Sequence, residues 1–156
     1  MSMEAREALR QLAYDYAACV DGLDAEALIM LFTEDGVVGS IDRSVPAFEG
    51  PDKLRRMVAQ VDEAFVKTMH NVHNHSFDHI GEAEASGETT CIASHIVEGE
   101  DGSWQVFDMA LRYANRYRKV GGAWRFAERR LDCQWTETRP CEPFDPAGLA
   151  YREGEN

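Results

Sequence analysis

The sequence predicts an α+β fold in which three N-terminal helices pack against a curved antiparallel sheet. Up to about Lys67, apolar residues recur with the 3.6-residue period of a helix, and after it they alternate with the period of two that a strand requires. The joints between the later apolar runs contain Asp-Gly and Gly-Gly, which are the turn residues of β-hairpins. A run of helices followed by a run of strands is typical of this fold class.

The helical part divides into three segments. The first helix is predicted from about Glu4 to Val20, where the apolar residues share one face. The segment "DGLD" then ends it, with Gly22 as the expected C-terminal cap and Asp24 as the N-cap of a second helix, Ala25 to Phe32. A short strand follows at Val37–Ile41. The third helix is predicted within "GPDKLRRMVAQVDEAFVK", which opens with the Gly-Pro typical of a helix start.

Four long strands make up the second part of the chain. Their expected ranges are Met69–Gly81, Thr89–Gly99, Ser103–Val120 and Ala123–Trp135. Because every joint between them is short and rich in glycine or acidic residues, consecutive strands are expected to be antiparallel neighbours.

The last of these strands carries two apolar patterns that are out of phase. Trp124 and Phe126 occupy even positions, whereas Leu131, Cys133 and Trp135 occupy odd ones. The two sets can face the same side only if an extra residue is inserted, so a β-bulge is predicted near "ERR", residues 128–130. The alternative is that the two sets pack on opposite faces.

Length and charge limit the possible classes of protein. The 156 residues fit one domain, predicted as residues 1–136, followed by a proline-rich extension of residues 137–156. A net charge of −12 argues against nucleic acid and anionic membranes as partners, since both require a basic face. No apolar run approaches the ~20 residues that span a bilayer, and no signal-peptide core is present. A cytoplasmic protein with free cysteines is therefore expected.

The segment "MHNVHNHSFDHI", residues 69–80, holds four of the five histidines. Strand alternation places His70 with Val72 on one face and His73, His75 and His79 on the other. His73 and His75 could share a metal ion, but a zinc or iron site needs a further ligand. The favoured interpretation is a polar or subunit-facing strand surface, with no metal and no cofactor.

His70 has candidate partners elsewhere in the chain. Asp21 ends the first helix, with Tyr14 and Tyr16 in the turns before it, and His95 stands alone among apolar residues in "CIASHIV". A carboxylate that holds an imidazole raises its basicity, which suits proton abstraction near neutral pH. A buried pair that satisfies the helix break is the structural alternative. Spacing alone does not show that Asp21 and His70 meet.

Several segments resemble the SnoaL-like branch of the nuclear transport factor 2-like superfamily. They are "YAACVDGLDAEALIMLFTEDGVV", "FEGPDKLRRMV", "TMHNVHNHSFDHIGEAEASGE" and "RYRKVGGAWRFAERRL", and the resemblance runs from about Ala5 to Trp135. It implies a cone-shaped α+β barrel, with the sheet wrapped around the three helices and a deep pocket at the wide end.

The resemblance also implies roles for particular residues. The branch is similar to scytalone dehydratase, a bile-acid dehydratase and a hexachlorocyclohexane dehydrochlorinase, whose shared Asp–His dyad falls on Asp21 and His70. The second pocket histidine of scytalone dehydratase falls on His95, a tyrosine of the bile-acid dehydratase falls on Tyr16, and a pocket arginine of the dehydrochlorinase falls on Arg129.

Two positions depart from this pattern. Val20 and about Ser40 stand where scytalone dehydratase has tyrosines, so scytalone itself is not the expected substrate.

The resulting hypothesis is a cofactor-independent lyase or isomerase acting on a small hydrophobic ring compound such as a polyketide, steroid or aromatic. His70, oriented by Asp21, would remove a proton beside a carbonyl, and His95 and Tyr16 would supply the acid or hydrogen bond. The remaining predicted substrate-binding residues are Tyr14, Phe32, Val72, Phe107, Met109, Leu111, Tyr113, Arg129 and Trp135.

The alternative hypothesis is a non-catalytic ligand-binding or assembly subunit, such as a protein like the β subunit of ring-hydroxylating dioxygenases. A homo-oligomer of two or three copies is expected for the enzyme, whereas an assembly subunit should co-purify with another chain.

Overall fold

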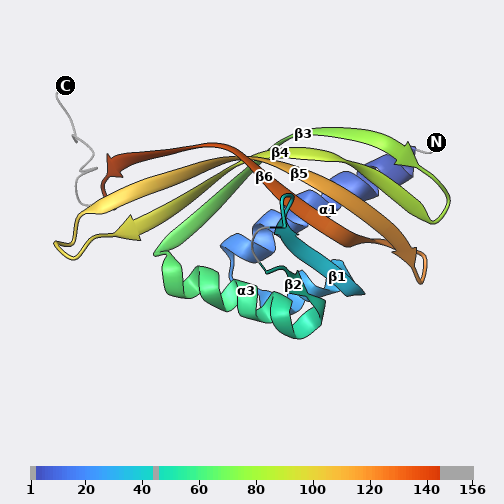
Figure 1. Cartoon of the computed structure of the whole chain (residues 1–156), viewed down its shortest axis with the longest axis horizontal. Coiled ribbons are helices and arrows are strands. Elements are labelled where there is room, and N and C mark those ends of the chain that lie inside the picture. Colours follow the sequence, from blue (N-terminus) through green and yellow to red (C-terminus); the bar gives the residue numbers. More distant parts are fainter. Residues whose placement is uncertain (1–2, 44–45, 145–156) are drawn as a thin grey trace, which may run out of the picture.

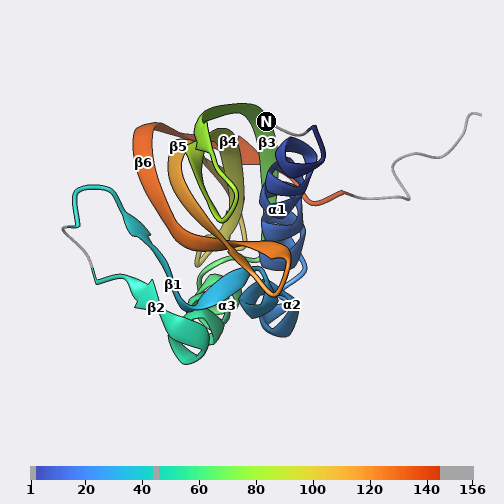
Figure 2. The same cartoon turned by 90° about the vertical axis from the view of Figure 1, so that its right-hand side faces the viewer.

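The computed structural model describes residues 3–43 and 46–144, which form three helices and one six-stranded sheet. Figures 1 and 2 show the four long strands as a strongly curved and twisted sheet, with the helices on one side of it. The elements in chain order are α1 (Met3–Asp21), α2 (Ala25–Met30), β1 (Phe32–Ser40), β2 (Phe48–Glu49), α3 (Gly50–Ala64), β3 (Lys67–Ile80), β4 (Glu84–Glu98), β5 (Trp104–Val120) and β6 (Ala123–Cys141).

The strands follow the order β2-β1-β6-β5-β4-β3, and the sheet is curved and open. Consecutive long strands pair antiparallel, as predicted, but β1 runs parallel to β6. The sheet is therefore mixed. Antiparallel neighbours are connected by hairpin turns, whose residues can be read from the sequence. β1 and β6 are far apart in the chain and no turn connects them, so the sequence does not show that they pair. The predicted cone-shaped α+β architecture is otherwise confirmed.

A left-handed residue ends α1 sharply. Leu23 has a φ of 56°, and its backbone N–H donates to the carbonyl of Val20 at 3.2 Å. The N–H of Asp24 donates to the carbonyl of Cys19 at 2.9 Å, which completes a Schellman motif. Gly22 is thus the C-cap residue, as predicted, and the left-handed residue is the next one, Leu23. The predicted N-cap is confirmed, because the Asp24 carboxylate accepts the N–H of Ala27 at 2.9 Å.

The main core lies between the helices and the concave face of β1 and β6. Phe32 and Phe126 pack with ring centroids 5.3 Å apart, and Tyr16 contacts both at 6.2 Å. Full burial of such a side chain stabilises the fold by about 1.5–3 kcal/mol. Phe32 was predicted at the end of the second helix, but α2 stops at Met30 and Phe32 begins β1.

A β-bulge resolves the phase conflict in β6. Tyr117 pairs with Phe126 while Arg116 pairs with Glu128, so the extra residue is Ala127, just before the predicted segment 128–130. The bulge brings Phe126 and Arg129 to the same inner face.

A second register shift lies further along β6. Leu111 pairs with Cys133, whereas Ala110 pairs with Trp135. The extra residue turns Trp135 to the outer face of the sheet.

Bulges also change the histidine-rich strand. Val72 pairs with Cys91 but His75 pairs with Thr89, so one extra residue lies between them in β3. The shift reverses the alternation and directs His75 inward, to the side of His70. The prediction that His75 faces outward with His73 is therefore wrong.

The last strand is longer than predicted. β6 continues through Cys141 and pairs with β5 up to Trp104, so residues 137–141 of the predicted extension belong to the sheet. Residues 145–156 of that extension lie outside the described part of the chain. The four cysteines are free thiols. None of the helices in residues 3–43 and 46–144 has the length and apolar character needed to cross a membrane.

Candidate active site

The carboxylate of Asp21 meets His70 where α1 ends against β3. Its Oδ1 atom accepts a hydrogen bond from Nδ1 of His70 at 2.7 Å and from the Thr68 hydroxyl at 2.7 Å. Its Oδ2 atom accepts the backbone N–H of His70 at 2.8 Å. Three hydrogen bonds therefore hold this carboxylate in one orientation, and the two residues that sequence spacing could not connect form a pair.

This pairing determines the chemistry of the imidazole. Burial by itself raises the pKa of Asp21, but the hydrogen bonds from His70 and Thr68 outweigh it and bring the pKa below its ordinary value. An ionised carboxylate only accepts hydrogen bonds, so Nδ1 of His70 carries a proton and the lone pair lies on Nε2. The contact with Asp21 thus fixes the orientation of the His70 ring and leaves Nε2 as its hydrogen-bond acceptor.

His70 lines a cavity of about 230 Å³ on the concave side of the sheet. The other polar rings around it are those of His95, Tyr16 and Tyr113, and no Asp, Glu, Lys or Arg is found among its described lining residues. An apolar cavity with a few convergent polar groups is the usual form of a small-molecule site.

His95 is buried in this wall and lies 6.0 Å from the His70 ring, centroid to centroid. Its Nδ1 atom is 3.2 Å from the carbonyl oxygen of Phe107, and its ring packs 4.5 Å from that of Phe65. Burial, reinforced by His70, lowers the pKa of His95, which keeps the ring neutral near pH 7. Because a carbonyl can only accept, Nδ1 of the neutral ring is the protonated nitrogen and Nε2 is an acceptor.

Tyr16 is a further polar residue of the cavity wall. Its side chain is buried and lines the cavity. Burial is the largest influence on this phenol and raises the pKa of Tyr16, against a smaller opposing effect of Arg129, so the hydroxyl stays protonated at neutral pH. The wall of the cavity therefore contains both an imidazole oriented by a carboxylate, at His70, and a protonated phenol, at Tyr16.

Three of the predicted substrate-binding residues, Met109, Leu111 and Tyr113, line the cavity, and several others do not. Phe32 lies in the core, and Tyr14 is an exposed residue of α1 whose ring packs 5.5 Å from that of His75. Neither Val72 nor Phe107 is among the residues around the cavity, although Phe107 contacts the His95 ring at 6.0 Å.

Arg129 is also absent from the cavity wall, because it lies behind the rings of Tyr113 and Tyr16. Its guanidinium carbon is 3.7 Å from the Tyr113 ring centroid and 4.5 Å from that of Tyr16.

Part of the cavity wall was missed at the sequence level. Met57 and Val61 of α3 line it together with Val20 of α1 and Val38 of β1. The two α3 residues lie on the apolar face of the third predicted helix, and helical periodicity does not separate a face that touches core from one that touches a cavity.

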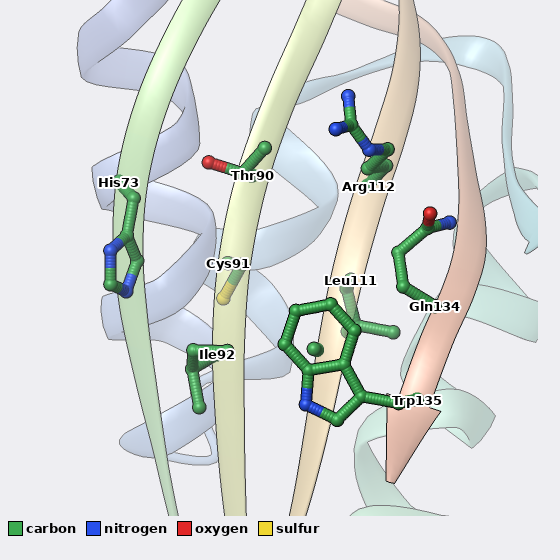
Figure 3. Close-up of a pocket in the computed structure, with 9 residues that line it drawn as sticks. His73, Thr90, Cys91, Ile92, Leu111, Arg112, Gln134 and Trp135 are labelled. Atoms are coloured by element: carbon green, nitrogen blue, oxygen red, sulfur yellow. The ribbon is translucent and has the colours of Figure 1, made fainter.

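A second hollow, of about 210 Å³, lies on the outer face of the sheet and contains Trp135. Figure 3 shows His73, Thr90, Arg112 and Trp135 on the near side of the strands, with the N-terminal helix behind them. Neither His70 nor His95 lines this hollow. The prediction that Trp135 forms a wall of the His70 cavity is wrong, because the second bulge of β6 reverses its direction.

Within residues 3–43 and 46–144, no three side chains of His, Cys, Asp or Glu come together as a potential metal site. His73 and His75, which could have shared a metal on a regular strand, point to opposite faces because of the bulge between Val72 and His75.

The curved sheet, the helices on its concave side and the cavity between them define the class of cone-shaped α+β proteins. Residues 1–130 match the SnoaL-like domain model, and the chain belongs to the SnoaL-like domain family.

Solved structures of this fold include hexachlorocyclohexane dehydrochlorinase LinA type 2, at 18% identity and a TM-score of 0.80 over 94% of this chain and 97% of that one. A provisionally named scytalone dehydratase from Novosphingobium aromaticivorans is 25% identical, with a TM-score of 0.74 over 93% and 94% of the two chains. A provisionally named aromatic ring hydroxylase from the same organism is 22% identical, with a TM-score of 0.76 over 90% and 96%. No protein of curated function matches the sequence significantly.

Proposed function

We propose that the protein is a cofactor-independent lyase or isomerase of the dehydratase type, acting on a small hydrophobic ring compound. The observation that carries this proposal is the 2.7 Å contact between Asp21 and His70 at an apolar cavity. A carboxylate-oriented imidazole facing such a cavity is suited to removing a proton from a carbon acid.

In the proposed reaction, Nε2 of His70 takes a proton from the carbon next to a substrate carbonyl. The C–H bond breaks, its electron pair forms an enolate, and Asp21 stabilises the resulting imidazolium. The Tyr16 hydroxyl donates a hydrogen bond to the enolate oxygen. In a dehydration, the enolate then expels a β-hydroxyl, which takes up the proton from His70 and leaves as water. In an isomerisation, the same proton returns to a different carbon.

The cavity and the related structures support the substrate class. Its apolar wall, with no charged side chain among the described lining residues, favours a neutral ring compound over a sugar or a phosphate. A dehydrochlorinase and a provisionally named scytalone dehydratase share the fold, and both names denote eliminations from ring compounds. Val20 and Ser40 line the cavity where scytalone dehydratase carries tyrosines, so we expect a substrate other than scytalone.

The test requires a compound that the protein turns over, found by screening hydroxylated and halogenated ring ketones. With it, His70→Ala and Asp21→Asn should each lower kcat by about 100- to 10,000-fold, the usual contribution of a general base. The control is His73→Ala on the outer face, which should retain the wild-type kcat. Folded variants of His70 or Asp21 with near-normal activity would end the proposal.

The assembly-subunit alternative rests on the outer face of the sheet. Trp135 is 64% exposed beside an apolar hollow, an arrangement that favours contact with another chain. A subunit of this kind should co-purify with a different protein and show no turnover alone. An enzyme should instead be a stable homo-oligomer with an accessible cavity.

A further inference from the structure

Arg129 is a buried cation without a carboxylate. Its side chain is 1% exposed, and no Asp or Glu of the described chain forms an ion pair with it. An unpaired buried charge is costly for a fold, and such groups are otherwise paired or bound to a metal. An effect of this charge on the adjoining cavity would explain why a buried arginine occupies this position.

The guanidinium is held by hydrogen bonds to two side chains, the phenol of Tyr16 and the amide of Asn115. Nη1 of Arg129 donates to Oδ1 of Asn115 at 2.8 Å, and Nδ2 of Asn115 donates in turn to the Thr89 hydroxyl at 3.0 Å and the Tyr113 carbonyl at 3.2 Å. Asn115 and Thr89 are themselves buried. The Nε atom of Arg129 has no hydrogen-bond partner. The charge is therefore fixed in position but largely uncompensated.

Aromatic rings surround this charge and separate it from the cavity. The guanidinium carbon lies 3.7 Å from the ring centroid of Tyr113, 4.5 Å from that of Tyr16 and 5.0 Å from that of Phe126. Tyr16 and Tyr113 line the cavity, whereas Arg129 does not. The positive charge also acts on the phenol of Tyr16, where it opposes the rise in pKa that burial produces.

The two polar side chains of the site, His70 and Tyr16, thus each contact a charged residue, and the two charges are opposite in sign. Asp21, an anion, holds the base His70 from behind, and Arg129, a cation, lies behind the donor Tyr16. Proton abstraction by His70 moves negative charge onto the ligand. A cation in a low-dielectric surrounding strengthens the hydrogen bond that Tyr16 donates to that charge.

We propose that Arg129, held by Asn115, is a positioning residue that acts through Tyr16 and makes the cavity selective for the oxyanion form of a ring compound, a phenolate or an enolate. This deepens the proposed function and rests on it for its catalytic consequence. The binding selectivity can be measured without turnover.

The experiment uses two matched probes, 4-nitrophenol and nitrobenzene, with the full-length protein. 4-Nitrophenol changes its visible absorbance when it ionises, and nitrobenzene is the neutral analogue without the hydroxyl. On the wild type, we expect the bound nitrophenol to ionise about one pH unit or more below its value in buffer. Arg129→Gln should abolish this shift and weaken nitrophenolate binding about tenfold or more, while nitrobenzene binding stays unchanged.

Three further variants test whether Arg129 acts through Tyr16 and whether Asn115 holds it in place. Tyr16→Phe should abolish the shift like Arg129→Gln, Arg129→Lys should retain part of it, and Asn115→Ala should reduce it by freeing the guanidinium. His73→Ala on the outer face is the matched control and should bind both probes like the wild type.

The proposal is overturned if the wild type produces no shift or binds neither probe, or if Arg129→Gln weakens both probes equally, since that marks a purely structural role. Failure of the proposed reaction would appear separately, as normal turnover in the His70 and Asp21 variants.

Discussion

At the scale of single residues, His75 and His73 show how one inserted residue changes a side chain's surroundings. His73 lies at the outer face of the sheet, while the bulge directs His75 against α1. The His75 ring packs at 5.5 Å from Tyr14, and its buried Nε2 atom has no hydrogen-bond partner. Burial, together with the charges of Arg10 and Arg129, lowers the pKa of His75.

This environment predicts a loss of stability in acid. The unfolded chain takes up a proton at a histidine below about pH 6.5, whereas the folded protein resists protonation of His75 until lower pH. Stability should therefore fall as the pH drops from about 7.5 to about 5.5. His75→Phe should make this dependence shallower, as followed by thermal unfolding across the range. His73→Phe is the control and should keep the wild-type slope; equal slopes in all three proteins would contradict the prediction.

At the scale of elements, the Schellman motif after α1 positions the carboxylate of Asp21, which the proposed function pairs with His70. The motif ends the helix at Asp21 and turns the chain away. The carboxylate of this last helical residue lies against β3. The motif places Leu23 in the left-handed region with a φ of 56°, which costs an L-residue other than glycine about 1–2 kcal/mol. The "DGLD" segment predicted the helix end and its cap at Gly22, but not that Leu23 adopts the left-handed conformation.

The strain at Leu23 predicts a stabilising substitution. Leu23→Gly should raise the free energy of unfolding by about 1 kcal/mol, because glycine adopts this conformation without the steric cost and Leu23 is an exposed side chain. Urea denaturation measures the change. Leu23→Ala retains the strain and should show no such gain, so an equal effect of both variants would refute the explanation.

A second bulge of β3 lies between Phe77 and His79, which pair with Gly87 and Ser86, and it depends on close contact with β4. Gly87 pairs with Phe77, and a Cβ atom at Gly87 would fall on the carbonyl oxygen of Ser76 and 3.0 Å from Cα of Phe77. Gly87→Ala should therefore lower the free energy of unfolding by about 1–3 kcal/mol, as overpacking does. The neighbouring Ser86→Ala should change it by less than about 0.5 kcal/mol in the same denaturant titration. A Gly87→Ala variant as stable as the wild type would exclude this tight pairing.

At the scale of the whole molecule, the mixed sheet separates two surfaces with different properties. The concave side encloses the His70 cavity, and the outer side presents Trp135 beside the second hollow. Cross-strand ion pairs such as Arg112–Glu88 neutralise charges on this outer face, although the chain as a whole carries −12. A face with paired charges and an exposed aromatic residue is suited to contact between copies.

We therefore expect a homo-oligomer of two or three copies that depends on Trp135. Trp135→Ser should shift the mass measured by light scattering towards that of one chain, because the largest exposed apolar group of this face is lost. Met30→Ser removes a comparably exposed residue of α2 and should leave the mass unchanged. A Trp135→Ser variant with the wild-type mass would exclude this face as the interface.

The sequence by itself determined the local features of the protein. Periodicity identified the three helices and the four long strands, the turn residues predicted their antiparallel order, and the quoted segments identified the family. Asp24 as an N-cap and a bulge beside residues 128–130 were also readable, because helix caps and strand phase depend on neighbours in the chain.

Only the tertiary structure decided which of these residues meet. It brought Asp21 to His70, placed Arg129 behind Tyr16, turned His75 inward and Trp135 outward, and paired β1 parallel to β6. Each of these outcomes depends on strand register between residues far apart in sequence, and a single bulge reverses every side chain beyond it. Alternation read from the sequence assumes an unbroken strand, so it assigns a side chain to the correct face only as far as the first bulge.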